Sequence, residues 1–384
     1  MKVTINTREL IKALTLLWPA VPAASPKPVL QCVDIIGANA GKAVLHTTSL
    51  DLHVECTILA KAAYNGHILT PHNALFKACK LAKSAKSATI CLSGDNEKAQ
   101  VTWSGGKAEL IAYDPVEFPV FPLEPTEVGK VGVEKLTTML RGVAFAVTKA
   151  HSSYAISNIS LCCKDGLLQT IATDGNMLAI MSTKAAMKDF SLLVSPDVGD
   201  CLRGLKGEAT IYEEHEKKED PTPFNRLMIA CGSYRIAASC PQGRFPKYLD
   251  VIPKDAGLLA TIDIETNELA YLVSEAAKGT GDPPIVHLTV MSGEVGVSSK
   301  GVSANLSTTT KRETDYPSFE IDFKAKSLAG CLAFIGMPAR LAMSTTRKIS
   351  PTKLTPISRS RAEQGFFSTN DIQKLCVLMP HDIG

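Results

Sequence analysis

The chain contains three related segments in which a short strand-like run leads into a helical pattern: "TINTRELIKALTLLWPAV" (4–21), "VGVEKLTTMLRGVAFAVT" (131–148) and "TIDIETNELAYLVSEAAKG" (261–279). Leu10 and Leu136 occupy the same place in the first two, 126 residues apart, and Leu269 follows Leu136 by 133 residues. Self-similarity at a nearly constant spacing indicates a repeated structural unit. The sequence of 384 residues therefore divides into thirds, and we expect domains at 1–126, 127–254 and 255–384.

A second, shorter helix is expected in each third, at "PHNALFKACKLA" (71–82), "SPDVGDCLRGLKG" (195–207) and "KAKSLAGCLAFIG" (324–336). The remainder reads as roughly eight short strands per third, separated by turn residues. Two helices cannot cover both faces of such sheets, so we expect an α+β fold with both helices on one face of antiparallel sheets. Three such units in line, with their helices on the same side, would curve around whatever those helices face.

The overall composition is that of an ordinary globular protein, with 45% hydrophobic and 21% charged residues. No apolar run approaches the length of a membrane span, and the N-terminus lacks the apolar core of a secretory signal. The 11 cysteines include no CxxC pair. This usage predicts reduced thiols in the cytoplasm, with no metal site and no cofactor.

An enzyme is a weaker alternative. Cys162 and Cys163, with His151 not far away in sequence, offer a thiol nucleophile and a base. However, no third orienting group, Walker A, GxGxxG or GxSxG motif accompanies them. We therefore expect no catalytic activity and no catalytic residues.

The distribution of charge is more informative than the net charge of +3. Between Cys56 and Gly94 there are five lysines and no acidic residue, and Lys77, Lys80, Lys83 and Lys86 recur at every third position. On a helix, the first three would cover an arc away from the apolar side that carries Leu75 and Cys79. Such a stripe is either a solvated face or a contact for a polyanion such as nucleic acid.

The stretch "TIATDGNMLAI" (170–180) places a polar turn beside two large apolar side chains, Met177 and Leu178. Asp-Gly between strand-like runs is a strong hairpin signal. The apolar pair could simply face the core. Alternatively, it could line a small pocket that another protein's tail fills.

Several motifs together give the chain a family resemblance: "KPVLQCVDI" (27–35), "TTSLDLHVE" (47–55), "ATDGNMLAI" (172–180), "GRFPKYLDVIP" (243–253) and "VLMPHDI" (377–383). In this order and spacing they resemble the bacterial DNA polymerase III beta subunit, the sliding clamp. The resemblance covers essentially the whole chain. It implies three repeated clamp domains, each with two helices on the inner face and antiparallel sheets outside, in a head-to-tail ring formed by two copies.

The resemblance also implies a function and partners. The ring would encircle duplex DNA without reading its sequence, and so act as a processivity factor in replication. A pocket on the ring would tether the DNA polymerase III catalytic subunit, the clamp loader, repair polymerases and mismatch-repair proteins. A specialised paralogue with an altered pocket, and a monomeric nucleic-acid-binding scaffold, are the alternatives.

Carried over by resemblance, the peptide pocket would take residues from the turn, from the linker and from the C-terminal strand: Thr173, Gly175, Met177, Leu178, Phe245, Pro246, Val251, Val377, Leu378 and Met379. Buried Leu or Phe side chains of a partner would each contribute about 1.5–3 kcal/mol there. Ser157, Asp250 and His381 depart from the usual family pattern and would make the pocket less apolar and less positive.

The DNA-facing residues implied by the resemblance are the lysine stripe and cations on other inner segments: Lys12, Lys27, Lys77, Lys80, Lys83, Lys86, Lys135, Arg141, Lys149, Arg203 and Lys206. The third unit departs from this pattern, because Glu265, Glu268 and Glu275 oppose Lys278, Lys324 and Lys326. The positive lining is therefore expected to be uneven.

Ring closure should pair surfaces of the first and third units. We expect the strand "GKAELIAY" (106–113), through Lys107, Ala108 and Leu110, to meet the helix from Leu272 to Lys278. Two segments look like insertions: a charged hairpin tip at 213–225 and a basic stretch at 347–371. We interpret both as surface loops, with a second DNA or partner contact as the alternative for the latter.

Overall fold

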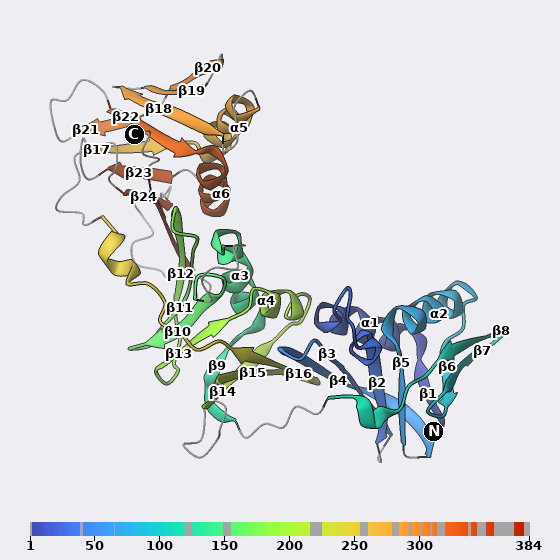
Figure 1. Cartoon of the computed structure of the whole chain (residues 1–384). Coiled ribbons are helices and arrows are strands. Elements are labelled where there is room, and N and C mark those ends of the chain that lie inside the picture. The colour runs from blue at the N-terminus through green and yellow to red at the C-terminus, as the bar shows by residue number, and fades with distance from the viewer. Residues whose placement is uncertain are drawn as a thin grey trace. The chain divides into compact units, whose positions relative to one another are not determined.

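The structure is a computed structural model. It describes the following residues: 2–38, 41–64, 66–119, 125–148, 155–215, 225–253, 260–278, 284–291, 294–299, 302–307, 309–312, 319–336, 339–343, 351–356 and 372–379. The chain forms two compact units (Figure 1). The first comprises residues 1–138 and 186–241, and the second comprises residues 139–185 and 242–384. These units do not coincide with thirds of the sequence, and the cuts near 126 and 254 stay a prediction.

The expected pair of helices is present in every third of the chain. The long helices of the repeat are α1 (Thr7–Leu17), α3 (Val133–Val143) and α5 (Thr266–Ala277), and the second helices are α2 (His72–Ser84), α4 (Asp197–Cys201) and α6 (Ala325–Ile335). The three repeat anchors, Leu10, Leu136 and Leu269, are all completely buried. The repeat thus reflects one packing position used three times.

Local sequence explains how these helices begin and end. Asn6 caps α1, because its side-chain Oδ1 accepts hydrogen bonds from the backbone N–H groups of Arg8 (3.0 Å) and Glu9 (3.2 Å). The helix expected at 195–207 is a single short turn of helix in the structure. Gly204 and Gly207 both have positive φ, which a continuing α-helix cannot accommodate.

The first unit contains one large antiparallel sheet with α1 and α2 packed together on it. Its main path runs β8-β7-β6-β1-β4-β16-β15-β14-β9, while β3 joins β4 to β2 and β5 pairs with β2. The strands are β1 (Lys2–Asn6), β2 (Cys32–Ala38), β3 (Lys42–Thr48), β4 (Leu52–Tyr64), β5 (Gly66–Pro71), β6 (Thr89–Gly94), β7 (Lys98–Trp103), β8 (Gly106–Ile111), β9 (Thr126–Gly132), β14 (Glu208–His215), β15 (Asn225–Cys231) and β16 (Tyr234–Cys240), with β13 (Phe190–Val194) packed against β15 and β16.

The second unit contains a sheet in the order β10-β11-β12-β25-β24-β23-β17-β21 and a four-stranded sheet in the order β20-β19-β18-β22. Helices α5 and α6 pack against each other. The strands are β10 (Ile159–Lys164), β11 (Leu167–Thr173), β12 (Met177–Lys184), β17 (Ala260–Ile264), β18 (Ile285–Met291), β19 (Glu294–Ser299), β20 (Val302–Ser307), β21 (Thr309–Arg312), β22 (Phe319–Lys324), β23 (Ala339–Met343), β24 (Thr352–Pro356) and β25 (Gln373–Leu378).

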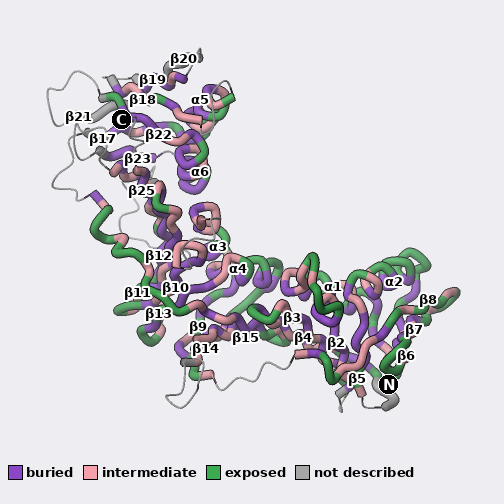
Figure 2. Tube along the Cα trace, viewed as in Figure 1, coloured by how far each residue is buried: buried purple, intermediate pink, exposed green. Residues whose placement is uncertain are grey.

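The expectation of antiparallel sheets with helices on one side is confirmed, and buried residues concentrate where helices meet sheets (Figure 2). One expectation about the loops is wrong. Residues 352–356 of the supposed insertion form β24, between β23 and β25, and Thr352 and Leu354 are buried. The hairpin at 213–225 is formed by β14 and β15, and its tip, like residues 357–371, lies outside the described residues.

Candidate functional site

A pocket of about 260 Å³ lies in the second unit, beside the turn that joins β11 to β12. Three segments far apart in the sequence form it: the turn itself, the linker after residue 242 and the end of β25. Its lining residues are Ile156, Thr173, Gly175, Met177, Leu178, Pro246, Lys247, Tyr248, Val251, Val377 and Met379. The pocket is therefore predominantly apolar, with Thr173, Lys247 and Tyr248 as its polar lining residues.

The turn is rigid because its own side chains satisfy its backbone. Asp174 Oδ1 accepts hydrogen bonds from the N–H groups of Asn176 (2.8 Å) and Met177 (2.9 Å). The Thr173 hydroxyl donates to the carbonyl of Met177 (2.7 Å). Gly175 has a φ of +86°, a conformation that favours glycine. The sequence Thr-Asp-Gly thus fixes where Met177 enters the pocket.

The C-terminal strand is held against the same turn. β25 pairs with β12 so that Val377 lies opposite Leu178, and the Met379 N–H donates to the Asn176 carbonyl (2.8 Å). Lys324 Nζ donates to the Asn176 side chain (2.8 Å). These contacts place Met379 at the pocket although it lies about 200 residues from the turn in sequence.

The pocket floor is a hydrophobic cluster of Ile171, Leu178, Ile180 and Val377, against which the linker aromatics pack. The Tyr248 hydroxyl donates to Gln169 Oε1 (3.4 Å). Burial raises the pKa of Tyr248, with a further contribution from Cys162. The phenol therefore stays a neutral hydrogen-bonding group at physiological pH.

Eight of the ten residues expected in the pocket line it, and two do not. Phe245 packs against the hydrophobic cluster of the floor instead, with its ring centroid 6.3 Å from that of Tyr248. Leu378 is completely buried, because successive side chains of a strand point to opposite faces and Val377 takes the pocket side.

Sequence reasoning missed Ile156, Lys247 and Tyr248. Lys247 and Tyr248 lie within the quoted "GRFPKYLDVIP" and could have been found there. Two of the residues expected to make the pocket less apolar, Ser157 and Asp250, are not among its lining, and His381 lies outside the described residues. Ile156, next to Ser157, supplies apolar surface at this position.

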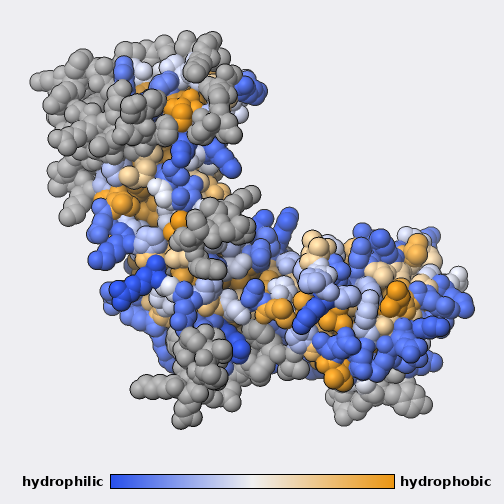
Figure 3. Space-filling model, in the orientation of Figure 1, coloured by the Kyte–Doolittle hydropathy of each residue, from blue (hydrophilic) through white to orange (hydrophobic). Residues whose placement is uncertain are grey.

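The basic residues of the expected DNA-facing set are mostly exposed: Lys12, Lys27, Lys77, Lys80, Lys83, Lys86, Arg141, Arg203 and Lys206 are exposed, and Lys135 is half-buried. Lys149 lies outside the described residues. Figure 2 shows the exposed side of α2, and Figure 3 shows hydrophilic side chains over it with apolar ones among them. Lys77, Lys80 and Lys83 share this helix face, as their spacing predicts.

Lys86 does not continue the helical stripe. It lies beyond the end of α2 with a φ of +57°, and its N–H donates to the Lys83 carbonyl (3.0 Å) while the Ser87 N–H donates to that of Ala82 (3.0 Å). This is the Schellman arrangement that ends helices, in which glycine usually holds the left-handed position. The three lysines whose spacing predicts a common helix face are therefore the ones on α2, and a DNA-facing position for Lys86 stays a prediction.

The third repeat carries acidic as well as basic side chains on and near α5 and α6. Glu265 and Glu268 are exposed, and Lys278 pairs with Glu275 (2.5 Å). Lys324 binds Asn176 at the pocket turn, and Lys326 is exposed. An uneven positive lining stays a prediction, supported by these acids.

The surfaces expected to close a ring are available on each unit. Within the described residues β8 pairs only with β7, so its other edge is open, and Ile111 is 64% exposed. Lys107 is exposed beside Glu109, while Ala108 and Leu110 are half-buried. Leu272 is half-buried and Lys278 is exposed. Their contact in a dimer stays a prediction.

A thiol nucleophile is not supported by the cysteines that suggested it. Burial raises the pKa of Cys162, which disfavours the reactive thiolate. Cys163 is buried, and His151 lies outside the described residues. Among the residues that the structure describes, no group of three or more histidine, cysteine or acidic side chains could hold a metal ion. None of the described helices has the length and apolar character of a membrane span.

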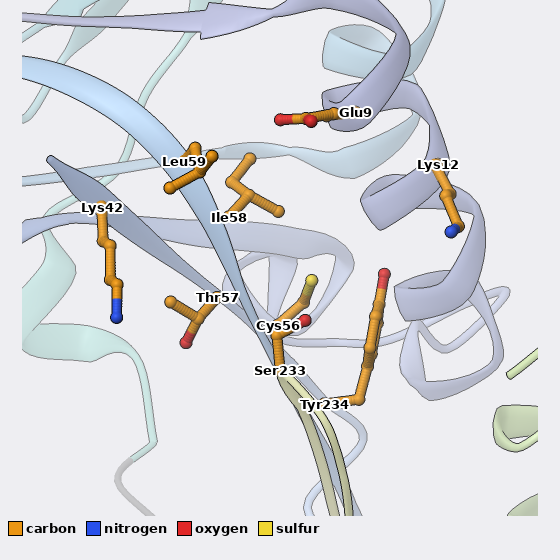
Figure 4. Close-up of a pocket in the computed structure, with 9 residues that line it drawn as sticks. All are labelled: Glu9, Lys12, Lys42, Cys56, Thr57, Ile58, Leu59, Ser233 and Tyr234. Carbon is orange, nitrogen blue, oxygen red and sulfur yellow. The ribbon is translucent and has the colours of Figure 1, made fainter. Parts of the chain in front are cut away.

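Another pocket, of about 380 Å³, lies in the first unit between α1 and the paired strands β4 and β16 (Figure 4). Glu9 and Lys12 approach it from α1, and Cys56 and Tyr234 lie at its base. Its lining includes both an acidic side chain, Glu9, and basic ones, Lys12 and Lys42, so its charges do not select one class of ligand.

The chain is similar in sequence to bacterial beta sliding clamps. It is 26% identical over 290 residues to that of Chlamydia pneumoniae, covering 73% of this chain and 75% of the relative. It is 21% identical over 355 residues to that of Caulobacter vibrioides, covering 88% and 91%. No family model matches the sequence.

The fold comparison covers the whole chain. The crystal structure of the DNA polymerase III subunit beta from Pseudomonas aeruginosa matches all of both chains with a TM-score of 0.84 at 20% identity. The beta subunit from Thermotoga maritima does so with a TM-score of 0.83 at 18% identity. The chain therefore has the fold of the bacterial beta sliding clamp, the DNA polymerase III beta subunit, and resembles that family in sequence over most of its length.

Proposed function

We propose that this protein is a DNA sliding clamp. Two copies form a ring around duplex DNA, and the pocket of the second unit tethers the replicative polymerase and other partners to it. The protein contributes no chemistry of its own, and it works in the cytoplasm. The pocket carries the proposal, because a preformed apolar slot built from three distant segments has the character of a binding site rather than of a catalytic one.

The occupant of the pocket is a short peptide with one or two large apolar side chains. Met177 and Met379 give walls that can adapt to different partners, since methionine side chains repack readily. The turn can orient an extended peptide through its carbonyl groups, because the N–H groups of Gly175, Asn176 and Met177 are already hydrogen-bonded to the side chains of Thr173 and Asp174. Candidate partners are the DNA polymerase III catalytic subunit, the clamp loader, repair polymerases and mismatch-repair proteins.

Basic residues on α1, α2, α3 and those after α4 support the DNA side of the proposal. Their positions fit contacts to phosphates, which position a protein on DNA without reading its bases. Sequence-independent contacts of this kind let a ring slide while it remains topologically trapped.

The test is titration with a fluorescent peptide from the C-terminus of a bacterial polymerase III catalytic subunit. Met379→Ala should weaken binding about tenfold, as expected for the loss of part of a buried contact. Leu178→Arg should abolish it, because a charge would enter the floor of the pocket. Circular dichroism melting shows whether Leu178→Arg remains folded.

Leu249→Ala is the matched control, because Leu249 is 68% exposed in the same linker and does not line the pocket. Its peptide affinity should stay within about twofold of that of the unmodified protein. Equal affinities of the Met379→Ala and Leu249→Ala variants would remove the pocket from the proposal.

A further inference from the structure

Three aromatic rings and a lysine form a continuous row at the junction of α1 and α2. The rings of Trp18 and His72 lie 5.2 Å apart, and those of His72 and Phe76 lie 6.2 Å apart and nearly parallel. Lys80 Nζ lies 4.6 Å from the centroid of the Phe76 ring. His72, Phe76 and Lys80 recur every four residues, which places them on one side of α2.

The row is anchored at its centre and exposed at its end. His72 is 1% exposed, and its Nε2 is hydrogen-bonded to the Leu14 carbonyl of α1 (2.8 Å). Trp18, in the short 3-10 helix that follows α1, is 51% exposed. A tryptophan held by a buried histidine but left half in solvent presents a flat apolar surface that the fold itself does not use.

The α2 side of the row is positively charged. Lys77, Lys80 and Lys83 are exposed on α2, and the chain has no acidic residue between Cys56 and Gly94. Helix α4, which contacts the 3-10 helix of Trp18, carries two aspartates and is followed by Arg203 and Lys206. The lysines of α2 thus favour a polyanion as the partner, and Arg203 and Lys206 offset the two aspartates of α4 in net charge.

We propose that this row is a stacking platform for unpaired bases of single-stranded DNA, with Trp18 stacked on a base and the lysines of α2 on the flanking phosphates. Aromatic rings beside basic side chains are the combination that single-stranded nucleic acid binding requires. A duplex cannot stack on the platform, because the faces of its bases are covered by neighbouring bases and only its base edges and phosphates are accessible to the protein. The proposal deepens the proposed DNA binding by adding a second DNA form.

The experiment uses tryptophan fluorescence of the full-length protein. The chain has two tryptophans, so Trp103→Phe leaves Trp18 as the single reporter. Titration with a 15-nucleotide oligo(dT) in low salt should quench this fluorescence, because stacking on a base quenches indole emission. A blunt duplex of the same length should bind without comparable quenching.

Affinities of labelled oligo(dT) and labelled duplex are then compared by anisotropy. Trp18→Ala should weaken oligo(dT) binding about tenfold and leave duplex binding within about twofold, given the usual contribution of one stacked base. Trp18→Phe should retain most of the oligo(dT) affinity, since a phenyl ring can still stack. Leu81→Ala is the matched control, because Leu81 is 60% exposed on α2 but outside the row.

Each outcome bears on the platform separately from the clamp. If Trp18→Ala leaves the affinity for oligo(dT) unchanged, or if oligo(dT) does not quench Trp18, the platform is overturned. Contact with another protein would then be the remaining role for the exposed Trp18 ring. Equal weakening of oligo(dT) and duplex binding also overturns it, because Trp18 would then act only through the fold. If duplex binding is observed but Trp18-dependent stacking is not, the platform is overturned and the clamp proposal stands. Quenching by oligo(dT) without any duplex binding would contradict the clamp proposal and support the platform.

Discussion

At the scale of single residues, the most unusual group is a set of histidines in the sheet of the first unit. The His46 and His53 rings lie edge to face at 5.3 Å, and His46 Nε2 lies 3.6 Å from Glu55 Oε2. Burial, together with a smaller contribution from the neighbouring His46, lowers the pKa of His53 to about 4. Burial also lowers the pKa of His46, although Glu55 and Asp34 oppose that effect.

These shifts make the folded state less stable in acid. A histidine whose pKa is lower in the folded than in the unfolded chain binds its proton first in the unfolded chain, so stability falls as the pH drops below about 6.5 and stops falling near the folded pKa. For His53 alone we expect the free energy of unfolding to drop by about 2 kcal/mol between pH 7.5 and pH 5. Urea denaturation of the protein and of His53→Gln at the two pH values measures the difference. A pH dependence that is the same in both proteins would contradict the assignment.

At the scale of elements, two helix ends test how much a left-handed residue costs. A residue with positive φ follows both α2 and α6: Lys86, just beyond the C-cap of α2, at +57°, and Gly336, the C-cap of α6, at +66°. Glycine adopts this conformation freely, whereas a residue with a Cβ is strained by about 1 kcal/mol. We therefore expect Lys86→Gly to stabilise the protein and Gly336→Ala to destabilise it, each by roughly 1 kcal/mol. Thermal or urea unfolding checks both, and opposite signs are the decisive result.

The basic face of α2 gives a second prediction at this scale. Replacing Lys77, Lys80 and Lys83 together by alanine should reduce the magnitude of the slope of log affinity for duplex DNA against log salt concentration by about 2–3. The reason is that DNA binding releases fewer counterions when fewer phosphates are neutralised. The control replaces three exposed lysines on sheet strands, Lys98, Lys164 and Lys184. An unaltered slope in the α2 variant would mean that this face does not meet DNA.

At the scale of the whole molecule, the clamp proposal depends on topology rather than on affinity. A protein trapped around a circle cannot leave it, whereas it can slide off the ends of a linear molecule. After loading, the protein should be retained on circular DNA through gel filtration and lost from the same DNA once a nuclease has cut it. Equal retention on both would exclude encirclement.

The dimer itself gives a further prediction. Native mass spectrometry should show twice the 41.0 kDa mass of the chain. Leu110→Asp, in the open edge of β8, should reduce the measured mass to that of a single chain.

Much of the fold could be predicted from the sequence because its signals are local. Helix periodicity, the Asn6 cap and the Thr-Asp-Gly turn depend on neighbours within a few residues, and the threefold repeat shows the same local pattern three times. The buried anchors Leu10, Leu136 and Leu269 confirm this interpretation. Where a local signal was absent the prediction was wrong, as at β24, whose five residues gain strand structure from neighbours on both sides.

What the sequence by itself determined is the α+β character, the repeated helices, the hairpin at Asp174–Gly175 and the acid-free lysine stretch. Only the tertiary structure decided that Val377 lines the pocket while Leu378 does not, and that Ile156 and Tyr248 complete the pocket wall. It also decided that Trp18, which follows α1, stands at the end of a row of rings that continues on α2. The physical reason is distance along the chain. Strand pairing and side-chain packing join residues that are tens to hundreds of positions apart, and the register of that pairing selects which side chains share a surface.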